Sequence, residues 1–282
     1  MTDPLVSTAW LHDHLSDSDI RVIDAAYRMP AMRPPLAADE YKARHIRGAV
    51  FFDIDQVADH TTNLPHMLPP PLLFAREVGA LGIESNDLVV IYDRGDYMGA
   101  PRAWWTFGTF GHDRVKVLDG GLKKWIADGY PVDAEIVTPA PRTYHAHLKE
   151  DRVRRLSQMR DNVETGTEQV IDARARERFE GTAAEPWPGR RSGRIPGSLN
   201  VPFNELIDPV TGEMKSAAAL RTIFEGVHAD LGKPIVTTCG SGVTAGVLSL
   251  ALARLGVESA LYDGSWAEWG LPDGPRIDTG KI

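Results

Sequence analysis

Short runs of β-branched residues alternate along the chain with segments that have helical periodicity. The runs predict strands near Val22-Ile23, Val89-Val90-Ile91, Val115-Lys-Val117, Val170-Ile171 and Ile235-Val236-Thr237. Such alternation is typical of parallel strands joined by crossover helices. A longer apolar stretch at 243–257 is interrupted by polar residues and is too short to span a bilayer, so it predicts a buried helix from Ala245 to Leu255. The pattern as a whole predicts an α/β fold.

The pattern occurs twice. Four blocks return in the same order at an offset of 144 to 149 residues: 20–25 as 168–173, 45–49 as 194–198, 88–95 as 234–241 and 117–125 as 261–269. Self-similarity at a nearly fixed spacing indicates duplication of a structural unit. We therefore expect a tandem duplication of one α/β domain, each copy having a mainly parallel sheet flanked by helices.

The domain limits follow from the repeats. The first domain is expected at 1–132 and the second at 153–282, opened by a helix from about Val153. The segment 133–152 contains Pro139 and Pro141, has little helical periodicity and is interpreted as a linker. Each half is large enough to bury its own core without a disulfide or a structural metal.

The composition of the chain argues against several classes of function. The net charge of −8 argues against general nucleic-acid binding, which needs a basic face. The single cysteine excludes an internal disulfide and any multi-cysteine metal centre, and it fits a reducing compartment. The histidines show no metal-ligand spacing, so no metal is expected. The first residues lack the basic and apolar regions of a secretory signal, and no membrane segment is expected, so the predicted location is the cytoplasm.

The cysteine lies in a loop suited to nucleophilic chemistry. The sequence Cys239-Gly-Ser-Gly-Val-Thr244 follows the strand predicted at 234–238 and precedes the helix predicted at 245–255. A strand–loop–helix of this kind directs several backbone N–H groups and a helix N-terminus to one point. Gly240 and Gly242 permit a tight turn and a close backbone approach. Such a cradle stabilises a thiolate or a persulfide, although a buried structural cysteine is the alternative.

The duplication indicates which domain is catalytic, and the loop sequence argues against one class of cysteine enzyme. The position equivalent to Cys239 in the first half is Asp93, so only the second domain can perform thiol chemistry. The first domain is then a structural partner that closes the cleft. Cysteine phosphatases use a similar loop, Cys-x5-Arg, whose arginine clamps the phosphate. Here that position is Ala245, which argues against a phosphatase.

The motifs resemble those of the two-domain rhodanese family, and within it the 3-mercaptopyruvate sulfurtransferase branch. His45-Ile-Arg-Gly-Ala49 and 261–269 are similar to the two family signatures, and 239–244 is similar to the active-site loop of that branch. Thiosulfate-preferring relatives usually carry Arg and Lys where this chain has Gly240 and Ser241. The resemblance implies an active site in the cleft between the domains and a persulfide on Cys239. It implies sulfur transfer from mercaptopyruvate to a thiol acceptor, such as a thioredoxin-like protein, or to cyanide, without a cofactor.

The resemblance also assigns site residues. It implies a proton relay of Ser241, His66 and Asp55, whose hydroxyl, imidazole and carboxylate suit proton transfer to and from the substrate. It implies substrate contacts from the remaining loop residues, namely Gly240, Gly242, Val243 and Thr244. The alternative for His66 is a packing or loop-capping role.

Recognition of the substrate carboxylate departs from the family pattern. Of two family arginines, the first matches Arg178, but the second position holds Trp187. We expect Arg190 or Arg191 to take its place; the alternative is that this run is a solvated loop. If the carboxylate contact has been lost, a thiosulfate:cyanide sulfurtransferase is the alternative enzyme. A persulfide carrier or redox sensor without catalysis is the alternative outside enzymes.

Overall fold

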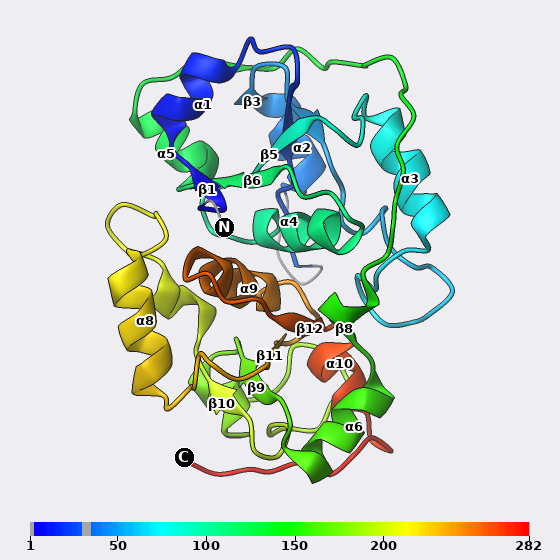
Figure 1. Ribbon diagram of the computed structural model, residues 1–282, viewed down its shortest axis with the longest axis vertical. Helices are drawn as coiled ribbons and strands as arrows, with labels where there is room; N and C mark the ends of the chain where they lie inside the picture. The colour runs from blue at the N-terminus through cyan, green and yellow to red at the C-terminus, as the bar shows by residue number, and fades with distance from the viewer. Residues whose placement is uncertain (1–2, 30–34, 282) are drawn as a thin grey trace. The chain divides into compact units, whose positions relative to one another are not determined.

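The computed structural model describes residues 3–29 and 35–281. The chain forms two compact units, each built around its own sheet (Figure 1). The first unit comprises Met1–His60, Leu68–Lys149 and Asp208–Met214. The second unit comprises Thr61–Met67, Glu150–Ile207 and Lys215–Ile282. The short segment 61–67 therefore belongs to the second unit, although it lies within the first half of the sequence. The segment 208–214 belongs to the first unit, although it lies within the second half.

The first unit contains a parallel five-stranded sheet in the order β1-β6-β5-β2-β4. Its strands are β1 (Leu5–Val6), β2 (Ile20–Asp24), β4 (Val50–Phe51), β5 (Leu88–Tyr92) and β6 (Val115–Leu118). Two short strands, β3 (His45–Ile46) and β7 (Val132–Asp133), form a separate antiparallel pair. The central strand β5 is buried along almost its whole length, as expected for a parallel strand covered on both faces.

Helices cover both faces of this sheet. The helices of the unit are α1 (Thr8–His14), α2 (Ala37–Ala43), α3 (Pro71–Ala80), α4 (Ala100–Thr109) and α5 (Gly121–Ala127). Leu11 of α1 and Trp125 of α5 pack on Val22 and Val90 on one face. Helix α4 packs against β5 and β6, and its Phe107 ring contacts Phe74 of α3 at 5.2 Å between centroids.

The second unit repeats this architecture. Its parallel sheet has the order β8-β12-β11-β9-β10, strand for strand the order of the first sheet. The strands are β8 (Val153–Arg154), β9 (Gln169–Asp172), β10 (Leu199–Asn200), β11 (Ile235–Thr238) and β12 (Ala260–Tyr262). The identical order confirms the predicted duplication of a parallel α/β unit.

The helices of the second unit are α6 (Leu156–Thr165), α7 (Arg176–Phe179), α8 (Ala217–Gly226), α9 (Ala245–Arg254) and α10 (Ser265–Trp269), with 3₁₀ turns η1 (Glu150–Arg152) and η2 (Phe203–Leu206). Met159 of α6 and Trp266 and Trp269 of α10 pack on Val170 and Val236 of one sheet face. Helix α9 packs against β11 and β12, and α8 packs against α9. Helix α9 confirms the predicted buried helix, since eight of its residues are buried.

The start of the second unit differs from the prediction. A helix was expected from about Val153, but Val153 lies in the edge strand β8 and pairs with Leu261 of β12. The helix begins at Leu156, where the Gln158 side chain accepts a hydrogen bond from the Arg155 N–H at 2.9 Å. The strand forms because burial of Val153 beside β12 outweighs its continuation into a helix.

Within the described ranges 3–29 and 35–281, no helix has the length and apolar character needed to cross a bilayer.

Candidate active site

Cys239 directly follows β11, at the carboxyl end of the central strand of the second sheet. Its side chain is buried, and its Sγ accepts a hydrogen bond from the Gly242 N–H at 3.1 Å. Gly242 has a φ of +84°, a conformation that residues with a side chain rarely adopt. The loop then enters α9, with Thr244 as the N-cap residue. The sulfur therefore faces a backbone donor at the start of a helix.

Helix α10 holds the loop from the other side. Trp266 N–H donates to the Cys239 carbonyl at 2.9 Å, and Ala267 N–H donates to the Gly240 carbonyl at 2.7 Å. Ser265 Oγ accepts a hydrogen bond from the Cys239 N–H at 3.3 Å and donates to the Tyr262 carbonyl at 2.9 Å. Ser265 has a positive φ of 47°, which these bonds hold in place. Sequence reasoning missed Ser265, although it lies inside the 261–269 signature.

The remaining loop residues lie as the sequence order requires. Val243 is buried and its carbonyl accepts a hydrogen bond from the Gly246 N–H at 3.1 Å, which starts α9. Ser241 and Thr244 are half-buried. The loop thus offers backbone donors and two hydroxyl groups close in sequence to the sulfur.

An arginine lies over the cysteine loop. A Cβ built at Gly240 would lie 2.9 Å from Nη2 of Arg178, the helix α7 residue expected to bind a carboxylate. The same guanidinium forms an ion pair with Glu185, in which Nη2 and Nε both donate to Oε2, at 2.5 and 3.2 Å. Arg178 keeps 24% of its side-chain surface exposed, whereas Glu185 keeps 1%. A buried carboxylate therefore orients a partly accessible cation beside the loop.

A second arginine completes this network. Arg174 is fully buried and donates to Glu185 Oε1 at 2.8 Å, to Asp172 Oδ2 at 2.7 Å and to the Gly193 carbonyl at 2.8 Å. Its guanidinium lies 4.1 Å from the centroid of the Trp266 ring. The network therefore connects β9, α10 and Arg178. Sequence reasoning missed Arg174 and Glu185, because ion pairs between residues eleven positions apart leave no periodic pattern.

The two arginines expected to replace the missing one have different surroundings. Arg191 Nη2 donates to the Trp269 and Pro275 carbonyls at 3.1 and 2.8 Å, at and after the end of α10, and its substrate-binding role stays a prediction. Arg190 Nε donates to the Ala267 carbonyl at 2.8 Å. Because the Ala267 N–H binds the cysteine loop, Arg190 is anchored close to that loop. It is the better of the two candidates.

The predicted relay residues lie in different units. His66 belongs to the second unit, is buried, and its ring makes an edge contact with Trp187 at 6.3 Å between centroids. Trp187 thus contacts a residue of the predicted relay. Asp55 belongs to the first unit, where its N–H donates to Asp53 Oδ1 at 2.9 Å. The relay of Ser241, His66 and Asp55 stays a prediction.

The first unit has a carboxylate where the second has its sulfur. Asp93 follows β5 and accepts hydrogen bonds from Gly95 N–H at 2.9 Å and Ala100 N–H at 3.2 Å. Its carbonyl accepts from Leu122 N–H at 2.8 Å, as the Cys239 carbonyl accepts from α10. Burial, with a smaller contribution from Asp96, raises the pKa of the Asp93 carboxyl to about 7. The loop geometry is retained without a thiol.

Among residues 3–29 and 35–281, no group of three or more His, Cys, Asp or Glu side chains is placed to hold a metal ion.

Comparisons with known proteins agree with this architecture. The model of the rhodanese-like domain matches residues 7–128 and 155–271. A thiosulfate/3-mercaptopyruvate sulfurtransferase of Arabidopsis thaliana is 44% identical over 95% of this chain and 84% of its own length. The 3-mercaptopyruvate sulfurtransferase of Escherichia coli K12 is 42% identical over 94% of each chain. The crystal structure of SseA from Escherichia coli, a 3-mercaptopyruvate sulfotransferase with the rhodanese fold, matches with a TM-score of 0.86 and 40% identity over 94% of this chain and 99% of that one. The chain therefore belongs to the rhodanese-like family, as a tandem pair of rhodanese-like domains, as the sequence resemblance implied.

Proposed function

We propose that the protein is a sulfurtransferase that takes sulfur from 3-mercaptopyruvate as a persulfide on Cys239 and passes it to a thiol or to cyanide. The observation that carries this proposal is that Cys239 Sγ accepts a hydrogen bond from the Gly242 N–H while the Arg178 guanidinium lies against Gly240, the next residue of the loop. One group supplies a nucleophile and the other a counter-charge for an anionic substrate. The relatives named as sulfurtransferases support the same activity.

The first half-reaction consumes the donor. The Cys239 thiolate attacks the substrate sulfur, a sulfur–sulfur bond forms, and the carbon–sulfur bond breaks. The electron pair of the broken bond moves onto carbon and gives the enolate of pyruvate, which takes up a proton and leaves. The substrate thiol loses its own proton, so the outer sulfur remains on the enzyme as a persulfide. This is covalent catalysis with a ping-pong order.

Proton transfers in this step are assigned to Ser241, His66 and Asp55. A hydroxyl next to the reacting sulfur can exchange a proton with the substrate, an imidazole can accept it, and a carboxylate can orient the imidazole. Burial of His66 against Trp187 supports a fixed ring orientation.

The second half-reaction removes the outer sulfur from the enzyme. An acceptor thiol, such as that of a thioredoxin-like protein, or cyanide attacks the outer sulfur, and Cys239 leaves as a thiolate. No metal or organic cofactor is needed for either step. A single free cysteine fits a reducing compartment, and we propose the cytoplasm.

Thiosulfate is the second candidate donor, and one observation favours it. Trp187 occupies the position of the second family arginine, so the recognition of a carboxylate is weakened there. Against it, the loop carries no cation at Gly240 or Ser241, next to the reacting sulfur. This balance favours mercaptopyruvate.

A comparison of kcat/KM for the two donors with cyanide as acceptor tests the proposal. We expect the value for mercaptopyruvate to exceed that for thiosulfate. A higher value for thiosulfate would replace the proposed donor. Transfer of one sulfur per enzyme without repeated turnover of either donor would indicate a persulfide carrier.

A further inference from the structure

The first unit has its own Arg–Glu pair that matches the pair beside Cys239. Arg28 Nη2 and Nε donate to the two carboxylate oxygens of Glu40 at 2.7 and 3.2 Å. The corresponding nitrogens of Arg178 donate to Glu185 at 2.5 and 3.2 Å. The two arginines are 150 residues apart and the two glutamates 145, close to the offset of the repeats. The duplicated unit therefore retains the arginine–carboxylate arrangement although it has lost the thiol.

An inner arginine is retained as well, but from a different position. Arg94 donates to the carboxylate of Asp24 at the end of β2 and to the Arg44 carbonyl at 3.1 Å. In the second unit, Arg174 donates to the aspartate at the end of β9 and to the Gly193 carbonyl at 2.8 Å. Arg94 follows β5, whereas Arg174 follows β9. The same charge arrangement is thus formed from two different loops.

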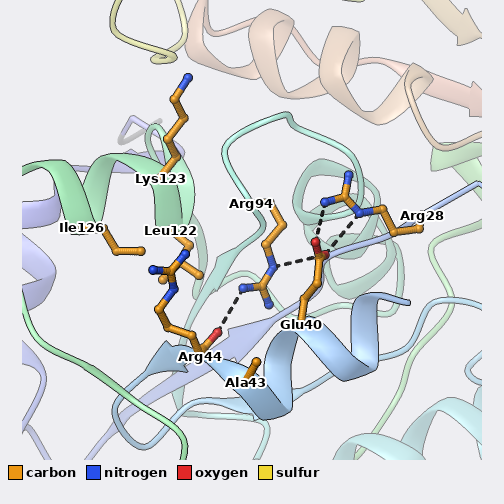
Figure 2. Close-up of a pocket in the computed structure, with 8 residues that line it drawn as sticks. All are labelled: Arg28, Glu40, Ala43, Arg44, Arg94, Leu122, Lys123 and Ile126. Carbon is orange, nitrogen blue, oxygen red and sulfur yellow. Dashed lines mark hydrogen bonds and ion pairs between the residues drawn. The ribbon is translucent and has the colours of Figure 1, made fainter. Parts of the chain in front are cut away.

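In the first unit this arrangement lines a cavity of about 620 Å³. Figure 2 shows Arg28, Arg44 and Arg94 around the same space, with Glu40 among them and Lys123 at the rim. Apolar side chains of α5 complete the lining. This volume lies in the range of small-molecule sites.

The cations of the cavity exceed the nearby carboxylates. Glu40 pairs with Arg28, Asp24 pairs with Arg94, and Asp96 lies 3.7 Å from Arg28. Three carboxylates therefore face four cations, and two of those cations have no acidic partner among residues 3–29 and 35–281.

Those two cations are Arg44 and Lys123. Within the described parts of the chain, neither side chain forms an ion pair or a hydrogen bond. In addition, Arg94 Nε is buried and donates no hydrogen bond to any described residue, since Glu40 Oε2 at 3.9 Å is too distant. A buried donor without an acceptor is costly, and an anion in the cavity would relieve that cost.

We propose that this cavity is a second, noncatalytic binding site of the protein, for a small carboxylate or sulfur oxyanion. Arg28, Arg44, Arg94 and Lys123 hold the anion by charge-assisted hydrogen bonds. No sulfur transfer occurs there, because Asp93 occupies the cysteine-equivalent position. Binding at this site does not depend on which donor reacts at Cys239.

The test is an NMR titration of ¹⁵N-labelled protein with pyruvate and, in a separate arm, with thiosulfate, both at constant ionic strength. The Nε–Hε signal of Arg94 and the amide signals of Arg44 and Lys123 report on the cavity alone. We expect a saturable shift of these signals in the wild type and in Cys239→Ser. The anion that saturates at the lower concentration identifies the preferred class.

The double variant Arg44→Gln/Lys123→Gln is expected to weaken this binding at least tenfold. Lys42→Gln/Arg76→Gln removes the same charge from exposed positions outside the cavity and should bind as the wild type does. Arg178→Ala should leave the Arg94 shift unchanged, even if it abolishes turnover. No saturable shift with either anion, or equal weakening in the two double variants, would overturn the proposal.

Discussion

The Arg178 guanidinium occupies the space that a side chain at Gly240 would fill, with Nη2 2.9 Å from the place of a Cβ. Gly240 does not have the positive φ of Gly242, so a side chain at 240 would not strain the backbone but would make the guanidinium shift. The residue after the cysteine and the position of the anion-binding arginine are coupled. A longer side chain at 240 would displace Arg178 further from the loop.

We predict that Gly240→Ala impairs the use of mercaptopyruvate without unfolding the protein. The new methyl group forces Arg178 to shift, and the loss of one good carboxylate contact should lower kcat/KM about tenfold, or about 1.4 kcal/mol. Steady-state kinetics and thermal unfolding measure the two effects. Gly226→Ala is the matched control, because its Cβ meets nothing within 4 Å in an exposed helical turn. It should keep full activity and gain up to about 1 kcal/mol of stability. Equal activity of the two variants would show that Arg178 is not held at the loop for catalysis.

Arg178→Ala should lower kcat/KM for mercaptopyruvate by roughly 10- to 150-fold, the loss of a charge-assisted hydrogen bond of about 1.5–3 kcal/mol. If Arg190 replaces the second family arginine, Arg190→Ala should cost a similar factor and Trp187→Arg should change little. Arg191→Ala should instead lower stability, because that side chain binds backbone carbonyls after α10. Improvement by Trp187→Arg, with no effect of Arg190→Ala, would show that the contact was lost and not replaced.

Asp93 makes stability depend on pH. Burial raises the pKa of its carboxyl from 3.8 to about 7, so the folded protein binds the proton more tightly than the unfolded chain does. The stability that this proton confers is fully present below pH 3.8 and is lost as the pH rises towards 7. Asn at position 93 cannot ionise, so the variant does not lose this stability. Relative to the wild type, the Asp93→Asn variant should therefore be more stable at pH 8 than at pH 5.

Chemical denaturation at both pH values measures this difference. The exposed Asp39→Asn serves as a charge-matched control. Persulfide formation at Cys239 should persist in both variants. A pH-independent difference for Asp93→Asn would contradict the raised pKa, and loss of persulfide in a folded variant would contradict the noncatalytic role of the first unit.

The local pattern of residues was sufficient to predict the main strands and helix α9. Strand β11 is a continuous β-branched run and β5 contains one, and the loop after β11 could be predicted because Gly242 stands where a positive φ is required. The strand β8 was missed because two residues cannot show a period, and its pairing with β12 is set by residues over a hundred positions away.

The charge network around Cys239 was only partly predictable. Arg178 was found through a family motif, but the burial of Glu185 between Arg174, which follows β9, and Arg178 of α7 depends on how the folded segment packs. The duplicate pair of Arg28 and Glu40 was missed for the same reason. Nothing in the sequence favoured Arg190 over Arg191 as the substitute arginine. The two are distinguished by the backbone carbonyls to which their side chains donate.

The most direct test of the account is the intact mass of the protein after incubation with mercaptopyruvate and removal of the excess. The wild type should gain about 32 Da, the mass of one sulfur, and lose it on addition of cyanide or a thiol. Cys239→Ser should gain nothing and should not turn over. A sulfur adduct on the serine variant, or continued sulfur transfer by it, would contradict a persulfide on Cys239.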